Sequence, residues 1–149
     1  MQQSPRLKLL SQFRDQMIRF LDELIEQLPS ESQFIIIRIF FKDKIPVEDI
    51  MGNFIKQVLP HKHYIKTRNE KFFLQGTNIY NAAYKSHGKE SVDHFKNLWK
   101  SSLLDTEDRK VLWSWFDLFV LLGEKYLKTY GYVKGWEPDN KNLEEKKNT

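Results

Sequence analysis

The chain has 149 residues, of which 40% are hydrophobic, and a formal net charge of +4 at pH 7. A single domain of this length buries roughly two-thirds of its unfolded surface, and the absence of cysteine excludes disulfides, thiolate zinc sites and cysteine nucleophiles. Because no apolar stretch approaches the ~20 residues of a membrane-spanning helix and no signal-peptide core begins the chain, we expect a cytoplasmic protein without membrane contact.

The first predicted helix begins at Ser4 and Pro5, an N-cap followed by proline at the first helical position. It should run to about Leu28 and end at Pro29. Its apolar residues recur at three- and four-residue steps: Leu10, Phe13, Met17, Phe20, Leu24 and Leu28. We interpret this stripe as part of the core, and a homodimer through this N-terminal helix is the alternative.

Residues 34–41, FIIIRIFF, suit either a buried strand or a helix. We predict a helix, because Ser30 and Gln33 have the spacing of a capping box and no second strand-like run could pair with this one. Since the run is apolar on nearly every side, we expect it to be the central, most buried element. Arg38 should keep its charged head at the surface.

Two more helices are predicted before the middle of the chain. Pro46 opens the first, and Pro60 ends it and begins the second, HKHYIKTRNEKFFLQ, which should stop at Gly76. Residues 77–90 show little periodicity and are expected to form a loop. Ser91 should then cap a short helix that contains Trp99.

The densest apolar pattern lies in the last predicted helix, from about Thr106 to Tyr130. Asp105 and Asp108 have the spacing of a capping box at its start. The expected core face consists of Val111, Leu112, Trp115, Leu118, Phe119, Leu122 and Tyr126. We expect this face and Trp99 to pack against Phe34, because FIIIRIFF is the most apolar partner in the sequence.

These elements predict a single all-α domain over residues 1–137, a compact bundle of five or six helices. Residues 138–149 are rich in Asp, Asn, Lys and Glu. Such a segment cannot bury enough apolar surface to order itself, so we expect a disordered, charged C-terminal tail.

The positive charge is concentrated in the middle of the chain. Residues 61–102 contain eight basic and three acidic side chains, a local excess of +5, and this segment is either an ordinary solvated surface or a phosphate-binding one. If it binds nucleic acid, the candidate residues are the basic side chains and the base-reading asparagine of the helix near residues 61–74: Lys62, Lys66, Arg68, Asn69 and Lys71. Residues 34–73 could form a helix-turn-helix-like unit, although Gly52 lies inside a helix and not in the turn.

No catalytic signature appears in the sequence. His61 and His63 would point about 200 degrees apart on a helix, and neither an HExxH motif nor a glycine-rich phosphate loop is present. We therefore expect no enzyme activity, cofactor or metal. The predicted function is that of an interaction or structural protein with a protein partner, and nucleic-acid binding is the alternative.

Three blocks of the sequence carry a resemblance: FRDQMIRFLDELIEQLPSESQFIIIRIFFKDKIP, IKTRNEKFFL and FKNLWKSSLLDTEDRKVLWSWFDLFVLLGEKY. They are similar to small uncharacterised helical proteins of large nucleocytoplasmic DNA viruses of eukaryotes. The resemblance implies a viral protein in the host cytoplasm or in a virion. It implies no activity and no site residues.

Overall fold

The structure, a computed structural model, describes residues 4–71 and 96–138, which form an all-α fold as predicted. Its named helices are α1 (Pro5–Gln27), α2 (Ser32–Ile39), α3 (Val47–Gln57), α4 (Lys62–Lys66) and α8 (Thr106–Tyr130). A π-helical turn, η1 (Phe40–Lys44), continues α2, and a 3-10 turn, η2 (Leu59–His61), joins α3 to α4. The loop predicted at 77–90, the cap predicted at Ser91 and tail residues 139–149 lie outside the described residues.

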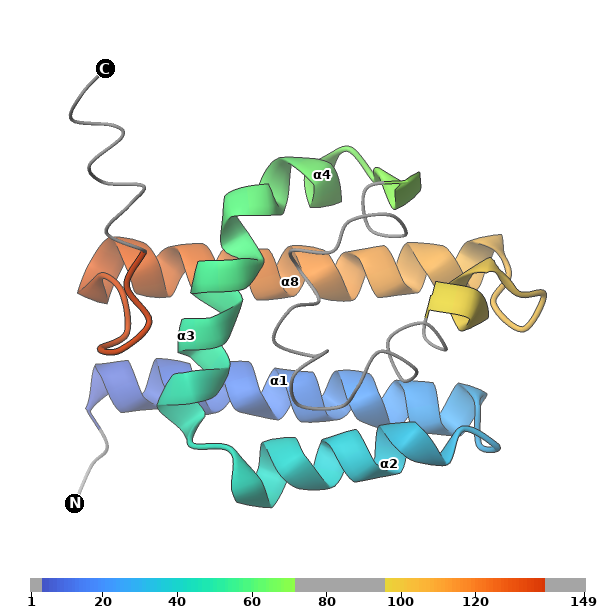
Figure 1. Cartoon of the computed structure of the whole chain (residues 1–149), viewed down its shortest axis with the longest axis horizontal. Coiled ribbons are helices and arrows are strands. Elements are labelled where there is room, and N and C mark those ends of the chain that lie inside the picture. The colour runs from blue at the N-terminus through green and yellow to red at the C-terminus, as the bar shows by residue number, and fades with distance from the viewer. Residues whose placement is uncertain (1–3, 72–95, 139–149) are drawn as a thin grey trace.

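Helices α1 and α8 run side by side along the molecule, and α2 packs on the side of α1 that is remote from α8 (Figure 1). Helix α3 crosses both long helices, and α4 lies against α8 (Figure 1). The central position that we expected for FIIIRIFF therefore belongs to α1. That prediction was wrong, because α1 is a 23-residue helix with an apolar stripe along it, whereas α2 has only eight residues.

The two long helices, α1 and α8, are capped at their N-terminal ends as predicted. The Ser4 hydroxyl accepts a hydrogen bond from the Leu7 N–H at 3.1 Å. At the start of α8, Asp105 Oδ1 accepts from the Asp108 N–H at 2.8 Å, and Asp108 Oδ2 accepts from the Asp105 N–H at 3.0 Å. This pair is the predicted capping box.

The capping box predicted at Ser30 is wrong. Helix α2 begins at Ser32, and its N-cap residue Glu31 makes no side-chain capping hydrogen bond. Ser30 lies instead in a tight turn after Pro29, which the Glu31 N–H closes by donating to the Leu28 carbonyl at 3.0 Å. A backbone hydrogen bond thus replaces the side-chain cap.

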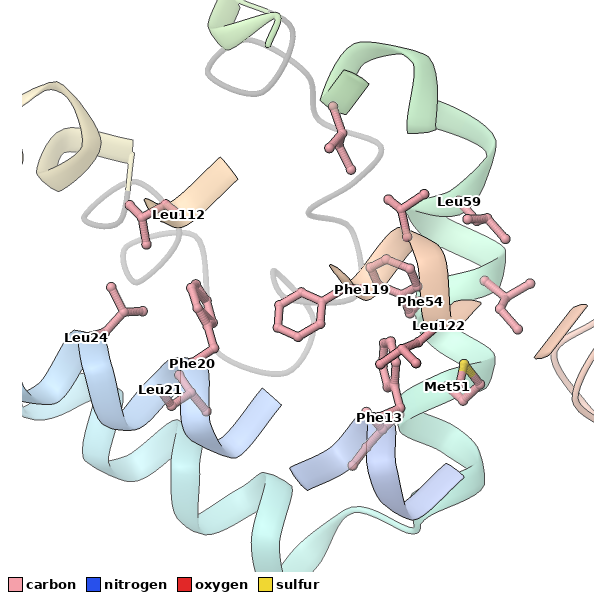
Figure 2. Close-up of a cluster of buried hydrophobic side chains, with 14 of the residues drawn as sticks. Phe13, Phe20, Leu21, Leu24, Met51, Phe54, Leu59, Leu112, Phe119 and Leu122 are labelled. Carbon is pink, nitrogen blue, oxygen red and sulfur yellow. The ribbon is translucent and has the colours of Figure 1, made fainter. Parts of the chain in front are cut away.

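Phe119 of α8 lies at the centre of the core, among side chains from α1 and α3 (Figure 2). Its ring centroid is 5.8 Å from that of Phe13, 5.6 Å from that of Phe20 and 6.4 Å from that of Phe54. The core interpretation of the α1 stripe is confirmed by its buried members: Leu10, Phe13, Phe20, Leu24 and Leu28. A homodimer through α1 could not use this stripe, because it is buried within the chain.

The buried side of α8 differs from the predicted face. Trp113 is buried, whereas Trp115 is only partly buried and Val111 is 44% exposed. The reason is that Trp99 packs against Trp113, with ring centroids 5.3 Å apart, which turns this part of α8 towards residues 96–104. Trp115 lies at the edge, where its Nε1 donates to Glu23 Oε2 at 2.7 Å.

The helix predicted from residue 61 to Gly76 is also interrupted. Helix α4 ends at Lys66, where the Thr67 hydroxyl donates to the His63 carbonyl at 3.0 Å. Arg68 then adopts a left-handed conformation with φ 55°. A non-glycine residue in this conformation is uncommon and requires surrounding contacts that hold it there.

Two contacts tie the last described residues to the rest of the fold. After Gly131 ends α8, Val133 is buried and the Trp136 indole donates to Asp49 Oδ1 of α3 at 2.9 Å. Near the end of α8, the hydroxyl of the buried Tyr126 accepts a hydrogen bond from Arg6 Nε at 2.9 Å. Side chains near both ends of the predicted domain, Arg6 and Trp136, are therefore hydrogen-bonded to its helices.

Candidate interaction surface

The basic residues predicted as a nucleic-acid site lie against acidic residues of α8. Lys62 and Lys66 approach the same carboxylate oxygen, Oε1 of Glu124, at 3.4 Å and 3.9 Å. This oxygen is buried beneath the two ammonium groups without a well-directed hydrogen bond. Since both lysine side chains are about half exposed or more, the attraction is screened by solvent.

Arg68 makes the more specific contact. Its guanidinium donates to both carboxylate oxygens of Asp117, at 2.7 Å and 2.6 Å, and to the Ile65 carbonyl at 3.0 Å. The same group lies 5.5 Å from the centroid of the Trp113 ring. The hydrogen bond with Asp117 raises the pKa of Arg68, with partial desolvation opposing it. These contacts explain how Arg68 is held in its left-handed conformation.

The five predicted residues therefore do not form one free basic face. Lys62 and Lys66 meet at Glu124, and Arg68 binds Asp117 two helical turns earlier on α8. Asn69 is half-buried, and its backbone N–H donates to the Tyr64 carbonyl at 2.9 Å, while Lys71 is exposed.

The sequence contained a signal for this arrangement that the charge count missed. Asp117 and Glu124 are seven residues apart, which places them on one side of a helix. Two acidic residues on the same side of α8 place negative charge opposite the basic residues of α4. The charge count treated the basic residues and their acidic partners on α8 as separate segments. The excess of positive charge in residues 61–102 therefore looked larger than it is in the folded chain.

The most unusual surface of the described residues is an apolar face on α2 and the start of η1. Four side chains on adjacent helical turns form this face, which we call the α2 face: Ile35, Ile36, Ile39 and Phe40. Their exposed fractions are 44%, 52%, 46% and 40%, respectively. Residues four apart on a helix are neighbours, so the four side chains form two adjacent rows and one continuous patch.

The opposite side of the same segment attaches it to the protein. Phe34 is buried, and Ile37 and Phe41 pack partly buried against the core. Arg38 is drawn away from the patch by Asp22 of α1, whose Oδ1 lies 2.5 Å from its Nε. The segment is thus apolar on both sides, and the side that carries Ile35, Ile36 and Ile39 is about half exposed.

A second feature is an open groove of about 930 Å³ between the end of α3, the second half of α8 and residues 132–138. Apolar side chains, among them Ile55, Leu59 and Leu127, form most of it, and the Lys62–Glu124 ion pair lies at its wall. Within the described ranges, no group of three or more His, Asp or Glu side chains is placed to hold a metal ion. The groove therefore offers an apolar surface with few converging polar groups.

No protein-family model matches the chain, and no curated protein or solved structure matches it. In residues 4–71 and 96–138, none of the helices has the length and apolar character needed to cross a membrane.

Proposed function

We propose that this protein is a non-enzymatic interaction or structural protein that binds a protein partner through the α2 face. The observation that carries the proposal is the exposure of Ile35, Ile36, Ile39 and Phe40 in one patch. Single exposed apolar residues are ordinary, but a continuous patch of large ones is typical of a binding surface.

The physical chemistry of the patch fits recognition of an apolar partner. Covering a large aliphatic side chain contributes about 1.5–3 kcal/mol when it goes from exposed to buried, so half-exposed side chains contribute part of this each. Three neighbouring isoleucines on a rigid helix also lose little side-chain entropy on binding, because β-branched residues already have restricted χ1 rotamers.

We also propose that the protein acts in the cytoplasm or in a virion, as its resemblance to proteins of large DNA viruses implies. The α2 face belongs to the first of the three sequence blocks that carry the resemblance. The complete absence of cysteine suits a reducing compartment.

The proposed function is tested with a variant that adds charge to the α2 face without touching its packed side. Ile36→Glu/Ile39→Glu should keep the helical circular dichroism of the wild type and lose its partner. A photo-crosslinking residue at Ile36 would identify what covers the face in an extract of the producing cells. Val111→Glu/Leu121→Glu is the matched control, because both side chains are exposed on α8. Equal binding by the α2-face variant and the wild type would refute the proposal.

A further inference from the structure

We propose that the groove between α3, α8 and residues 132–138 binds a fatty-acid anion, a ligand with an unbranched apolar chain and a carboxylate head. The groove has no residue in common with the α2 face, so this inference does not depend on the proposed function. Three features of the groove support it: the apolar lining, the anchored wall and the balance of charges.

The lining of the groove suits an apolar chain. Six apolar or aromatic residues from three parts of the fold line it: Ile55, Leu59, Pro60, Leu127, Tyr132 and Pro138. Tyr132 is 44% exposed, so part of this lining is in contact with water and can be covered by a ligand. The volume of about 930 Å³ lies in the upper part of the ~300–1,000 Å³ range of small-molecule sites.

The wall formed by residues 132–138 is anchored to the rest of the fold. Val133 is buried and its carbonyl accepts from the Trp136 N–H at 2.8 Å, while the Trp136 indole donates to Asp49 Oδ1 at 2.9 Å. Gly131 and Gly135, with φ of 78° and 90°, allow the turns that this wall requires. A preformed site loses little free energy to reorganisation when a ligand binds. The groove is therefore prepared for a ligand without rebuilding of its wall.

The charged residues of the groove favour an anionic head. Four of them line it: Lys62, Glu124, Lys128 and Glu137. Lys62 approaches Glu124 at 3.4 Å, and Glu137 accepts a hydrogen bond from the Gly135 N–H at 3.0 Å. The exposed ammonium group of Lys128 has no ion pair or hydrogen bond within residues 4–71 and 96–138. A carboxylate can therefore pair with Lys128 without breaking a contact that the described residues make.

Neighbouring charges add to the attraction. Lys66 also approaches Glu124, at 3.9 Å, so Lys62 and Lys66 share one carboxylate. Together with the other two charged residues of the lining, three basic and two acidic side chains gather here, which leaves a net positive charge. Leu127 and Lys128 are consecutive in α8 and both line the groove, so a chain that covers Leu127 brings its carboxylate head near Lys128.

Calorimetric titration with dodecanoate, below the concentration at which it forms micelles, tests the class of ligand. The wild type should bind dodecanoate, and decanoate, whose chain is two methylenes shorter, should bind about three- to tenfold more weakly. Lys128→Gln should weaken dodecanoate binding by about two- to fivefold and leave the binding of uncharged dodecanol unchanged.

Lys125→Gln is the matched control for Lys128→Gln. Lys125 is exposed on the same helix and does not line the groove, so this variant should bind both ligands like the wild type. An equal loss of dodecanoate and dodecanol binding in Lys128→Gln would overturn the pairing of Lys128 with the head. Tighter binding of dodecylammonium than of dodecanoate by the wild type would overturn the choice of an anion.

Nuclear magnetic resonance tests the position of the ligand. Dodecanoate should shift the methyl signals of Ile55 and Leu127, which line the groove. Tyr132→Ala should weaken binding by about threefold or more, because it removes exposed apolar surface from the wall. Leu121→Ala, on an exposed part of α8 outside the groove, should bind like the wild type. Shifts confined to the α2 face would overturn the proposal, because the amphiphile would then bind there.

Vesicles of anionic phospholipid distinguish a free fatty acid from a membrane lipid with a similar head charge. The wild type should bind dodecanoate and should not sediment with the vesicles. Sedimentation with the vesicles, or no binding of dodecanoate, would overturn the proposal. The test is separate from that of the proposed function, because Ile36→Glu/Ile39→Glu should bind dodecanoate like the wild type even though it loses its protein partner.

Discussion

Trp136 packs directly on Gly52, the residue of α3 that has no side chain. A Cβ atom at position 52 would lie 2.4 Å from Cδ1 and 2.6 Å from Cγ of Trp136. The glycine inside this helix therefore has a packing reason, and the indole–Asp49 hydrogen bond of 2.9 Å fixes the ring above it. Through this contact, the segment after α8 is anchored to α3.

The first prediction concerns Gly52→Ala. Alanine alone should stabilise the helix by about 1 kcal/mol, but here it displaces Trp136, and we expect a net loss of about 1–3 kcal/mol in the free energy of unfolding by urea. In a Trp136→Gly background, which also removes the Trp136 Cβ atom that would lie 3.0 Å away, the same change should become stabilising. A stabilising effect in both backgrounds would contradict the packing described.

The second prediction compares two tryptophans of α8. Trp113→Ala should lower the free energy of unfolding by about 3–5 kcal/mol, since this side chain is buried against Trp99. Trp115→Ala should cost less, about 1–2 kcal/mol, because Trp115 is only partly buried. Chemical denaturation of both variants checks the order, and a larger loss for Trp115 would reverse our description of the α8 core face.

The third prediction locates the end of the stable domain. Deleting residues 139–149 should leave the melting temperature and helical circular dichroism unchanged. Deleting residues 132–149 also removes the buried Val133 and the docked Trp136, so it should cost about 3 kcal/mol. A large loss from the shorter deletion would show that the tail contributes to the fold.

The fourth prediction concerns the Arg68–Asp117 pair. Because both side chains are more than 40% exposed, Arg68→Gln should cost no more than about 1 kcal/mol, and less at high salt. The raised pKa of Arg68 means that its contribution is fully present below the pKa of the unfolded chain and is lost only in strong alkali. Urea unfolding should thus show the same loss at about pH 6 and about pH 9. A loss that disappears between these values would refute this role of Arg68.

The fifth prediction tests the nucleic-acid alternative, which stays a prediction. Since Lys62, Lys66 and Arg68 already face acids of α8, the wild type should bind labelled duplex or single strands no better than Lys62→Gln/Lys66→Gln/Arg68→Gln/Lys71→Gln. Fluorescence anisotropy at about 50 and 200 mM salt checks this. Wild-type binding that falls steeply with salt and is absent from the fourfold variant would favour the alternative.

The sequence was a good guide wherever one local signal decided the outcome. Ser4 with Pro5, and Asp105 with Asp108, marked both long helices, because caps depend on residues a few positions apart. Arg68 shows the opposite case. Its left-handed conformation depends on Asp117, 49 residues away, and nothing in HKHYIKTRNEKFFLQ reveals that partner.

The candidate site was missed for a different reason. FIIIRIFF was correctly predicted as a helix, but its apolar content was taken as a measure of burial. Burial depends on how many neighbours the fold supplies, and α1 supplies only one side, so Phe34 is buried while Ile36 is exposed. Composition indicated that the segment needs apolar contacts and could not indicate how many of them lie within the same chain.

The hydrogen bond between Arg6 and Tyr126 joins residues 120 positions apart. Much of the apolar stripe of α1 is covered by α8, so α1 leaves the ribosome well before the helix that covers it. At a synthesis rate of about 5–20 residues per second, that delay lasts several seconds. During this time the nascent α1 and the isoleucines that follow it are exposed together. Exposed apolar surface in a nascent chain is prone to aggregate, and here it can be covered fully only after residues near 130 have left the ribosome.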